Sequence, residues 1–146
     1  MDRTRAEELI KRLQGGPHKN HEFAAGVSGS LTAVDSCDPL YREFFGDFYD
    51  EATGFVNKMT SYVAEFRNGS FTNTTIAEAF RLSHMVKGAS ATMGYKVITS
   101  LASGLESLFG DVRDGKVTLS PDLLDHVAET MGLISGHLEE LKKAVE

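Results

Sequence analysis

Residues 80–94, FRLSHMVKGASATMG, carry a helical pattern that ends at a glycine, Gly94. At about 100° per residue, His84 falls nearly opposite the residues that would face a core. The N-terminus of this helix is expected within residues 73–78, where Thr75 and Glu78 have the spacing of a capping box. The stretch therefore predicts an amphipathic helix that turns one histidine outward. The core-facing residues would be Ala79, Leu82, Ser83, Val86, Ser90 and Met93.

Three more helices are predicted around this one. The first begins at residues 38–39, a cap followed by a proline, and ends at residues 68–69. The third ends at residues 114–115, and the fourth begins at residues 120–121, again a cap and a proline. The expected apolar stripes are Leu40, Phe44, Phe48, Phe55, Met59, Tyr62 and Phe66 in the first helix, Val97, Ile98, Leu101, Leu105, Leu108 and Val112 in the third, and Leu124, Val127, Met131, Ile134, Leu138 and Leu141 in the fourth.

These patterns predict an all-α fold. No alternating strand pattern competes with the helices, and the connections are short, so consecutive helices should pack as an antiparallel up-down four-helix bundle. We place the bundle at residues 38–146 and a partly flexible leader at residues 1–37. The leader contains one short helical segment with Ala6, Leu9 and Leu13 at helical spacing, and whether it has a function is left open.

Composition excludes several classes of protein. The chain has 146 residues, which suits one domain, and a formal net charge of -6 without a basic stripe, which argues against nucleic acid as a partner. No apolar run approaches the roughly 20 residues of a membrane span, and the N-terminus lacks a signal-peptide core. The single Cys37 cannot form an internal disulfide or a cysteine-based zinc site. We therefore expect a cytoplasmic protein without a membrane partner.

The surroundings of His84 point to an approaching partner. Lys87, Gly88 and Ala91 lie three, four and seven residues further on, along the same outward face. A glycine inside a helix costs about 1 kcal/mol relative to alanine, so Gly88 indicates that something must come close to this face.

A glutamate on the next helix is expected to reach His84. His84 and Glu106 lie eleven residues on either side of Tyr95, so an antiparallel hairpin about Tyr95 brings them to the same level. Glu106 also lies off the apolar stripe of its helix. Its carboxylate could accept a hydrogen bond from one imidazole nitrogen and leave the lone pair of the other exposed. An oriented neutral imidazole beside the Lys87 ammonium suits phosphoryl transfer.

The sequence HMVKGASATMG resembles the His-x-x-Lys-Gly signature of histidine phosphotransfer (HPt) domains. The longer stretch EAFRLSHMVKGASATMGYKVITSLASGLESLFGDVRDGKVTLSPDLLD is similar to the phosphotransfer domain at the N-terminus of CheA-type chemotaxis histidine kinases, and the similarity covers about residues 38–143. The resemblance implies that His84 accepts a phosphoryl group from a histidine kinase catalytic domain and passes it to an aspartate of a response-regulator receiver domain. Lys87 would be the charge partner of the phosphoryl group, Gly88 the access residue and Glu106 the residue that orients the imidazole. Some members carry a second histidine on the third helix, where this chain has Ser103.

No glycine-rich nucleotide loop occurs in the chain, so we expect no ATP-binding kinase site and no metal or other cofactor in this domain. ATP and magnesium would be bound by the kinase domain, and magnesium by the receiver. Whether the chain counts as an enzyme is open, as is the choice between a piece of a larger kinase and a stand-alone protein. Without a sustained heptad seam, the isolated domain should be a monomer.

Three alternatives are weighed against this interpretation. One is a free-standing HPt protein of a phosphorelay unrelated to chemotaxis, and another is a non-catalytic bundle that only binds receivers. An apolar patch around Phe80 and Met85, beside the histidine, would serve docking in either case. The third is a metal-binding bundle, but no Glu-x-x-His pair occurs. His126 and His137 lie eleven residues apart, about 16.5 Å along a helix. A histidine pair in the leader, His18 and His21, has ligand-like spacing without a supporting scaffold.

Overall fold

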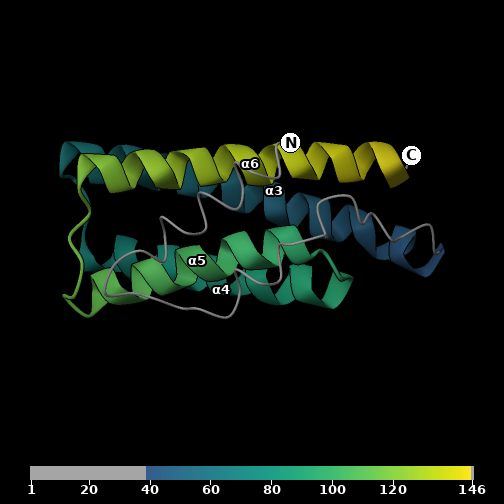
Figure 1. The fold of residues 1–146 in the computed structure, drawn as a ribbon, viewed down its shortest axis with the longest axis horizontal. Helices are drawn as coiled ribbons and strands as arrows, with labels where there is room; N and C mark the ends of the chain where they lie inside the picture. Colours follow the sequence, from purple (N-terminus) through teal and green to yellow (C-terminus); the bar gives the residue numbers. More distant parts are fainter. Residues whose placement is uncertain (1–38, 146) are drawn as a thin grey trace.

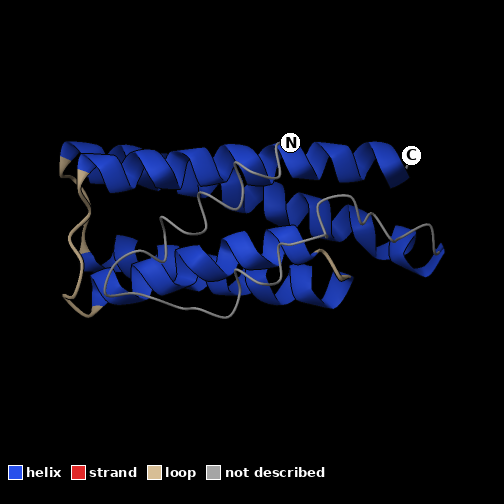
Figure 2. Cartoon of the chain, in the orientation of Figure 1, coloured by secondary structure: helices blue, strands red, loops and turns tan. Residues whose placement is uncertain are grey.

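The structure, a computed structural model, describes residues 39–145, with side chains from residue 43 onward. This part of the chain forms helices joined by short loops, without a strand, which confirms the all-α prediction (Figure 2). The predicted leader, residues 1–37, and the cap at Asp38 lie outside the described residues, so the domain boundary stays a prediction. The helices are α3 (Pro39–Asn68), α4 (Asn73–Met93), α5 (Lys96–Arg113) and α6 (Pro121–Val145).

The helices form the predicted up-down bundle. Each helix runs antiparallel to the one before it, with α3 and α6 along one side and α4 and α5 along the other (Figure 1). The most extensive helix–helix contact joins α4 to α5, followed by α3 with α6, and the smallest joins α5 to α6. The bundle is therefore built from two helix pairs, and the pair formed by α4 and α5 is the tighter one.

The core follows the predicted stripes in α4, α5 and α6, where all the expected residues are buried except Val112, which is half-buried. In α3 the predicted stripe is wrong at two positions, and its first member, Leu40, lies outside the side chains that the structure describes. Phe44 is 53% exposed and Tyr62 is half-buried, whereas their neighbours Phe45 and Val63 are buried. Phe45 lies seven residues, or two helical turns, before the buried Ala52, so the core side of the helix falls on Phe45 and not on Phe44. The observed stripe of α3 is Phe45, Phe48, Ala52, Phe55, Met59, Val63 and Phe66.

The N-terminus of α4 also differs from the prediction. The N-cap is Thr72, and the capping box is formed with Thr75 instead of with Glu78. The Thr75 backbone N–H donates to the Thr72 hydroxyl over 3.4 Å, and the Thr72 backbone N–H donates to the Thr75 hydroxyl over 3.2 Å. Glu78 instead accepts a hydrogen bond from Arg81 at 2.7 Å. A threonine at the third helical position can replace the usual glutamate because its hydroxyl also accepts a hydrogen bond.

A two-residue turn, Gly94 and Tyr95, joins α4 to α5. Gly94 has a φ of 80°, a left-handed conformation that glycine adopts without steric cost, and the Tyr95 N–H donates to the Ser90 carbonyl at 2.9 Å. The Tyr95 ring is buried against the rings of Phe45 and Phe48, with centroid distances of 6.4 and 5.2 Å. The turn is thereby packed against α3, and its shortness limits the register between α4 and α5.

Candidate functional site

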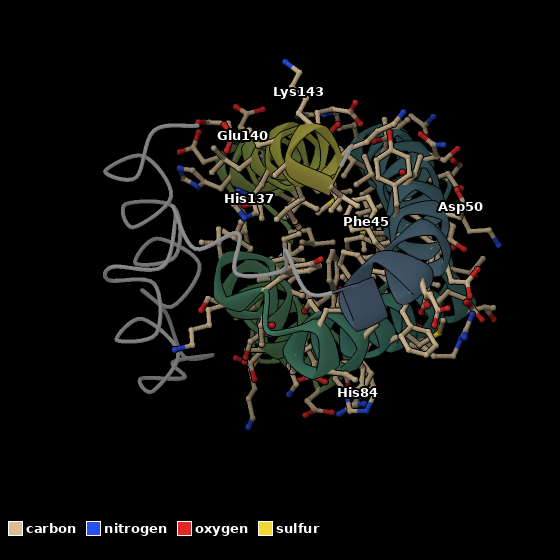
Figure 3. All side chains as sticks on the ribbon, turned by 90° about the vertical axis from the view of Figure 1, so that its right-hand side faces the viewer. Phe45, Asp50, His84, His137, Glu140 and Lys143 are labelled. Atoms are coloured by element: carbon tan, nitrogen blue, oxygen red, sulfur yellow. The ribbon has the colours of Figure 1, made fainter. Side chains whose placement is uncertain are left out.

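His84 lies on the outer face of α4, away from the core (Figure 3). Its side chain is 66% exposed, which leaves most of the imidazole ring accessible to another molecule. The position follows from the helical pattern, because Ser83 and Val86 on the other side of the helix are buried. The histidine is therefore presented on a rigid element and not on a loop.

A single carboxylate on α5 contacts both basic side chains of the site. Glu106 Oε2 contacts His84 Nδ1, and Glu106 Oε1 accepts a hydrogen bond from Lys87 Nζ at 2.7 Å. The Glu106 side chain is only 14% exposed, whereas that of His84 is open to solvent. The carboxylate thus lies beneath two basic groups that are one helical turn apart on α4, and it contacts both of them.

Glu106 is charged in this arrangement. Burial alone would raise the pKa of its carboxyl group, but hydrogen bonds from Lys87 and then His84 outweigh burial and hold that pKa below its ordinary value. An ionised carboxylate can only accept hydrogen bonds, so a neutral His84 ring must donate its Nδ1 proton to Glu106. The lone pair then resides on Nε2, and this tautomer follows from the contact.

The third predicted feature is an open surface beside the histidine. Gly88 is exposed, and a Cβ atom built on it would meet no atom within 4 Å. Ala91, one turn further, is exposed as well. No packing among the described residues therefore requires a glycine at residue 88. The exposed small residues Gly88 and Ala91 leave room on this face for an approaching molecule.

Small buried residues bring α4 and α5 close enough for the contact with Glu106. Ser83 and Ser90 on α4 and Ser103 and Gly104 on α5 are all buried. Ser90 also hydrogen-bonds across the helix pair, with 2.8 Å between its hydroxyl and that of Thr99. The position expected to align with a second histidine in some HPt domains, Ser103, is thus a buried serine one turn from Glu106.

Phe80 and Met85 do not form the apolar patch suggested by the sequence. They are five positions apart in sequence, which places them about 140° apart around the helix. The Phe80 ring is half-buried, with the Arg113 guanidinium 4.5 Å from its centroid. Met85 is 38% exposed, and its sulfur lies 3.0 Å from an Arg81 nitrogen. The Arg113 contact could not be predicted from the sequence, because it depends on how two helices face each other.

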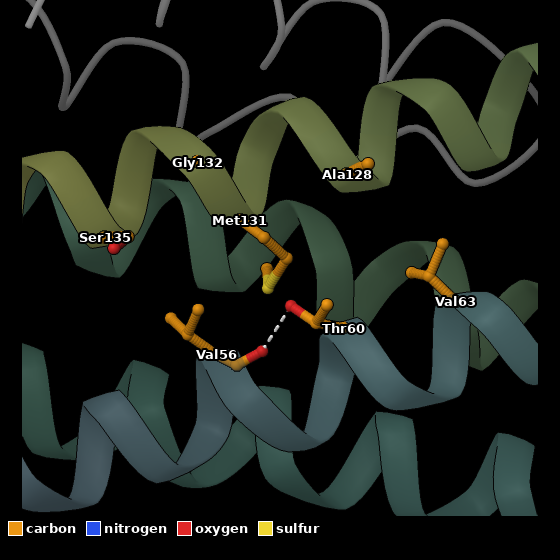
Figure 4. Close-up of a pocket in the computed structure, with 7 residues that line it drawn as sticks. All are labelled: Val56, Thr60, Val63, Ala128, Met131, Gly132 and Ser135. Atoms are coloured by element: carbon orange, nitrogen blue, oxygen red, sulfur yellow. Dashed lines mark hydrogen bonds between the residues drawn. The ribbon is translucent and has the colours of Figure 1, made fainter.

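Other features of the described residues lie away from this site. A groove of about 340 Å³ runs between α3 and α6, lined by Val56, Met131 and Gly132 among others (Figure 4). The side chains described contain no group of three or more histidine, cysteine, aspartate and glutamate residues placed to hold a metal ion. His18 and His21 lie outside the described residues. No described helix is long and apolar enough to cross a membrane.

Comparison with known proteins identifies the family. The family model described as Hpt domain matches residues 43–145, a range that holds His84, Lys87, Gly88 and Glu106. The chain belongs to the Hpt domain family. The match spans α4, α5 and α6 and nearly all of α3, so the whole described bundle corresponds to one Hpt domain.

Curated relatives of this Hpt domain carry the name chemotaxis protein CheA. The chain is 29% identical to CheA of Borreliella burgdorferi over 93 residues, 64% of this chain and 11% of that protein. It is 24% identical to CheA of Salmonella typhimurium over 104 residues, which make up 71% of this chain and 16% of that protein. It is 26% identical to CheA of Treponema pallidum over 105 residues, which make up 72% of this chain and 13% of that protein. The chain thus spans less than a fifth of the length of these relatives. No solved structure gave a significant match.

Proposed function

We propose that this Hpt domain is the phosphotransfer unit of a chemotaxis-type two-component pathway. In this proposal His84 accepts a phosphoryl group from a histidine kinase catalytic domain and passes it to an aspartate of a response-regulator receiver. The observation that carries the proposal is the double contact of Glu106, which touches His84 Nδ1 and Lys87 Nζ at once. The similarity to CheA proteins supports the chemotaxis type.

The first transfer forms a bond between His84 Nε2 and the γ-phosphorus of ATP. The Nε2 lone pair attacks the phosphorus, the bond to the bridging oxygen breaks, and ADP leaves with that electron pair. The ring gains positive charge as the bond forms, and the Glu106 carboxylate at Nδ1 stabilises that charge. The carboxylate therefore orients the nucleophile and stabilises the phosphorylated ring.

Lys87 and Gly88 act on the incoming group. The phosphoryl group brings about two negative charges, which compete with Glu106 for the Lys87 ammonium. Lys87 is half-buried with a flexible stem, so its ammonium can turn from Glu106 toward the phosphoryl oxygens. The open face at Gly88 admits the active site of the kinase and later that of the receiver. In the second transfer a receiver aspartate oxygen attacks the phosphorus, and the electron pair of the N–P bond returns to Nε2.

Cofactors belong to the partners in this proposal. The kinase domain binds ATP with magnesium, and the receiver binds magnesium beside its aspartate. The Hpt domain itself supplies only the nucleophile and the groups around it. It would act in the cytoplasm, as a monomer when isolated, without contact with nucleic acid or membrane.

Phosphorylation by a CheA-type kinase catalytic fragment tests the proposal. The protein is incubated with the fragment, labelled ATP and magnesium, and the label is then tested for loss in acid, as expected of a phosphoramidate. The wild-type protein should take up acid-labile label, and a His84→Gln variant should take up none. A His126→Gln variant, the same substitution on a half-buried histidine of α6, is the matched control and should behave as wild type.

Two results would overturn the proposal. Equal labelling of wild type and His84→Gln would remove His84 as the acceptor. Absence of label from folded wild-type protein, together with retained binding of receivers, would favour a non-catalytic receiver-binding bundle instead.

A further inference from the structure

A second contact joins α4 and α5 one turn away from the histidine. Phe80 precedes His84 by four residues on α4, and Gly110 follows Glu106 by four residues on α5. Residues four apart lie on the same face of a helix. The pairs Phe80–Gly110 and His84–Glu106 therefore lie at successive levels, one helical turn apart, along α4 and α5.

The Phe80 ring lies directly against the backbone of α5. A Cβ atom built on Gly110 would stand 3.3 Å from Phe80 Cε2 and 3.6 Å from Cδ2, and Gly110 is buried. The same construction at Gly54, Gly88 or Gly132 meets no atom within 4 Å. A side chain at residue 110 would thus require the ring or the helix to shift by a few tenths of an ångström, which does not hold for those three glycines.

Arg113, also on α5, makes a second contact with the ring. Its guanidinium lies 4.5 Å from the centre of the Phe80 ring and also donates to Asp114 at 3.1 Å. Attraction between a cation and an aromatic face favours this position. The ring thus contacts α5 at the Gly110 backbone and at the Arg113 guanidinium, so a shift that makes room for a larger residue 110 would also disturb the contact with Arg113.

We propose that Gly110 is a positioning residue for phosphotransfer. By admitting the Phe80 ring against its backbone, it sets the distance between α4 and α5 at the level where Glu106 must reach His84 Nδ1. The hydrogen bond between Ser90 and Thr99 at 2.8 Å joins the two helices on the other side of the histidine. The His84–Glu106 contact therefore lies between two other contacts of the helix pair, Phe80–Gly110 and Ser90–Thr99. This inference rests on the proposed function of His84.

The test compares Gly110→Ala with Gly54→Ala, a glycine on α3 with free space around it. Two quantities are measured: the rate of His84 phosphorylation by a CheA-type kinase catalytic fragment, and the ¹⁵N NMR shifts of the His84 imidazole, which report the tautomer. Because alanine favours a helix more than glycine, neither variant should lose its helical circular dichroism. Gly110→Ala should lower the rate at least about five-fold, since small misplacements of reacting groups are costly. It should also move the imidazole shifts toward mixed tautomers, whereas Gly54→Ala should leave both quantities unchanged.

A double variant distinguishes positioning from general damage. Phe80→Leu removes the ring atoms that the new methyl group would meet, so Phe80→Leu/Gly110→Ala should recover part of the rate and of the single-tautomer shifts relative to Gly110→Ala. Wild-type rate and shifts in Gly110→Ala would overturn the inference, as would a double variant no better than the single one. The imidazole shifts need no kinase. A shift change in Gly110→Ala therefore supports the positioning role even where wild-type protein takes up no phosphate, a result that would sink the proposed function alone.

Discussion

At the scale of single residues, the central feature of the site is Glu106, which contacts His84 and Lys87 at once. Its placement could be predicted from the sequence, because His84 and Glu106 are equidistant from the turn at Tyr95. The simultaneous contact with Lys87 was not predicted, since it depends on the path of a flexible side chain. That contact matters because it keeps the carboxylate charged. The roles of these residues in transfer stay predictions that the variants below test.

Replacing Glu106 by glutamine should slow phosphorylation of His84 without unfolding the domain. The amide keeps the size of the side chain but carries no charge, so it stabilises neither the Nδ1–H tautomer nor the positive ring as well. We expect the initial rate to fall about ten-fold to a hundred-fold, as for other groups that orient a functional histidine. Glu43→Gln, on the exposed face of α3, is the control. An unchanged rate in Glu106→Gln would remove Glu106 from the mechanism.

At the scale of elements, α4 and α5 were predicted better than α3. The stripes predicted for α4, α5 and α6 fall on buried residues apart from Val112, so one helical period fits each of these helices. In α3 two adjacent phenylalanines, Phe44 and Phe45, both suit a core, and periodicity from Phe44 selected the wrong one. The Phe80–Gly110 contact could have been found by the same symmetry about Tyr95, since each lies fifteen residues from it.

The open face of α4 yields a prediction in which stability and activity change in opposite directions. Gly88→Ala should raise the free energy of unfolding by up to about 1 kcal/mol, because alanine favours a helix and no atom obstructs its methyl group. The same methyl group should slow phosphorylation by standing where the partner approaches. Urea denaturation followed by circular dichroism and initial-rate assays measure the two effects. Gly54→Ala on α3 should stabilise similarly and leave the rate unchanged; a Gly88→Ala variant with wild-type rate would contradict the access role.

At the scale of the whole molecule, the bundle contains a histidine that the proposed mechanism does not use. His137 on α6 is buried, and its Nδ1 lies 3.5 Å from a Glu140 oxygen. Burial lowers the pKa of its imidazole, although Glu140 partly opposes this shift. Its burial could not be told from the half-burial of His126 by sequence alone, because burial of a helix face by its neighbours is a property of the assembled bundle.

The lowered pKa of His137 predicts a loss of stability in mild acid. As pH falls, the unfolded chain takes up a proton at His137 before the folded protein does. The free energy of unfolding is therefore unaffected by this group above the unfolded pKa of about 6.5, and it decreases as pH falls from there through the lower folded pKa. His137→Leu removes the buried imidazole and should flatten the dependence of unfolding free energy on pH between about 7.5 and 5. Urea denaturation at several pH values measures it, with His126→Gln as control. Parallel curves for wild type and His137→Leu would contradict this account.

The most direct test of the central claim is to identify the nitrogen that carries the phosphoryl group. Protein labelled with ¹⁵N is phosphorylated by a CheA-type kinase catalytic fragment with ATP and magnesium, and ³¹P–¹⁵N couplings are recorded by NMR. Because Glu106 holds Nδ1, we predict that phosphorus couples to Nε2 of His84 while Nδ1 keeps its proton. Coupling to His84 Nδ1, or to a nitrogen of another histidine, would contradict the account.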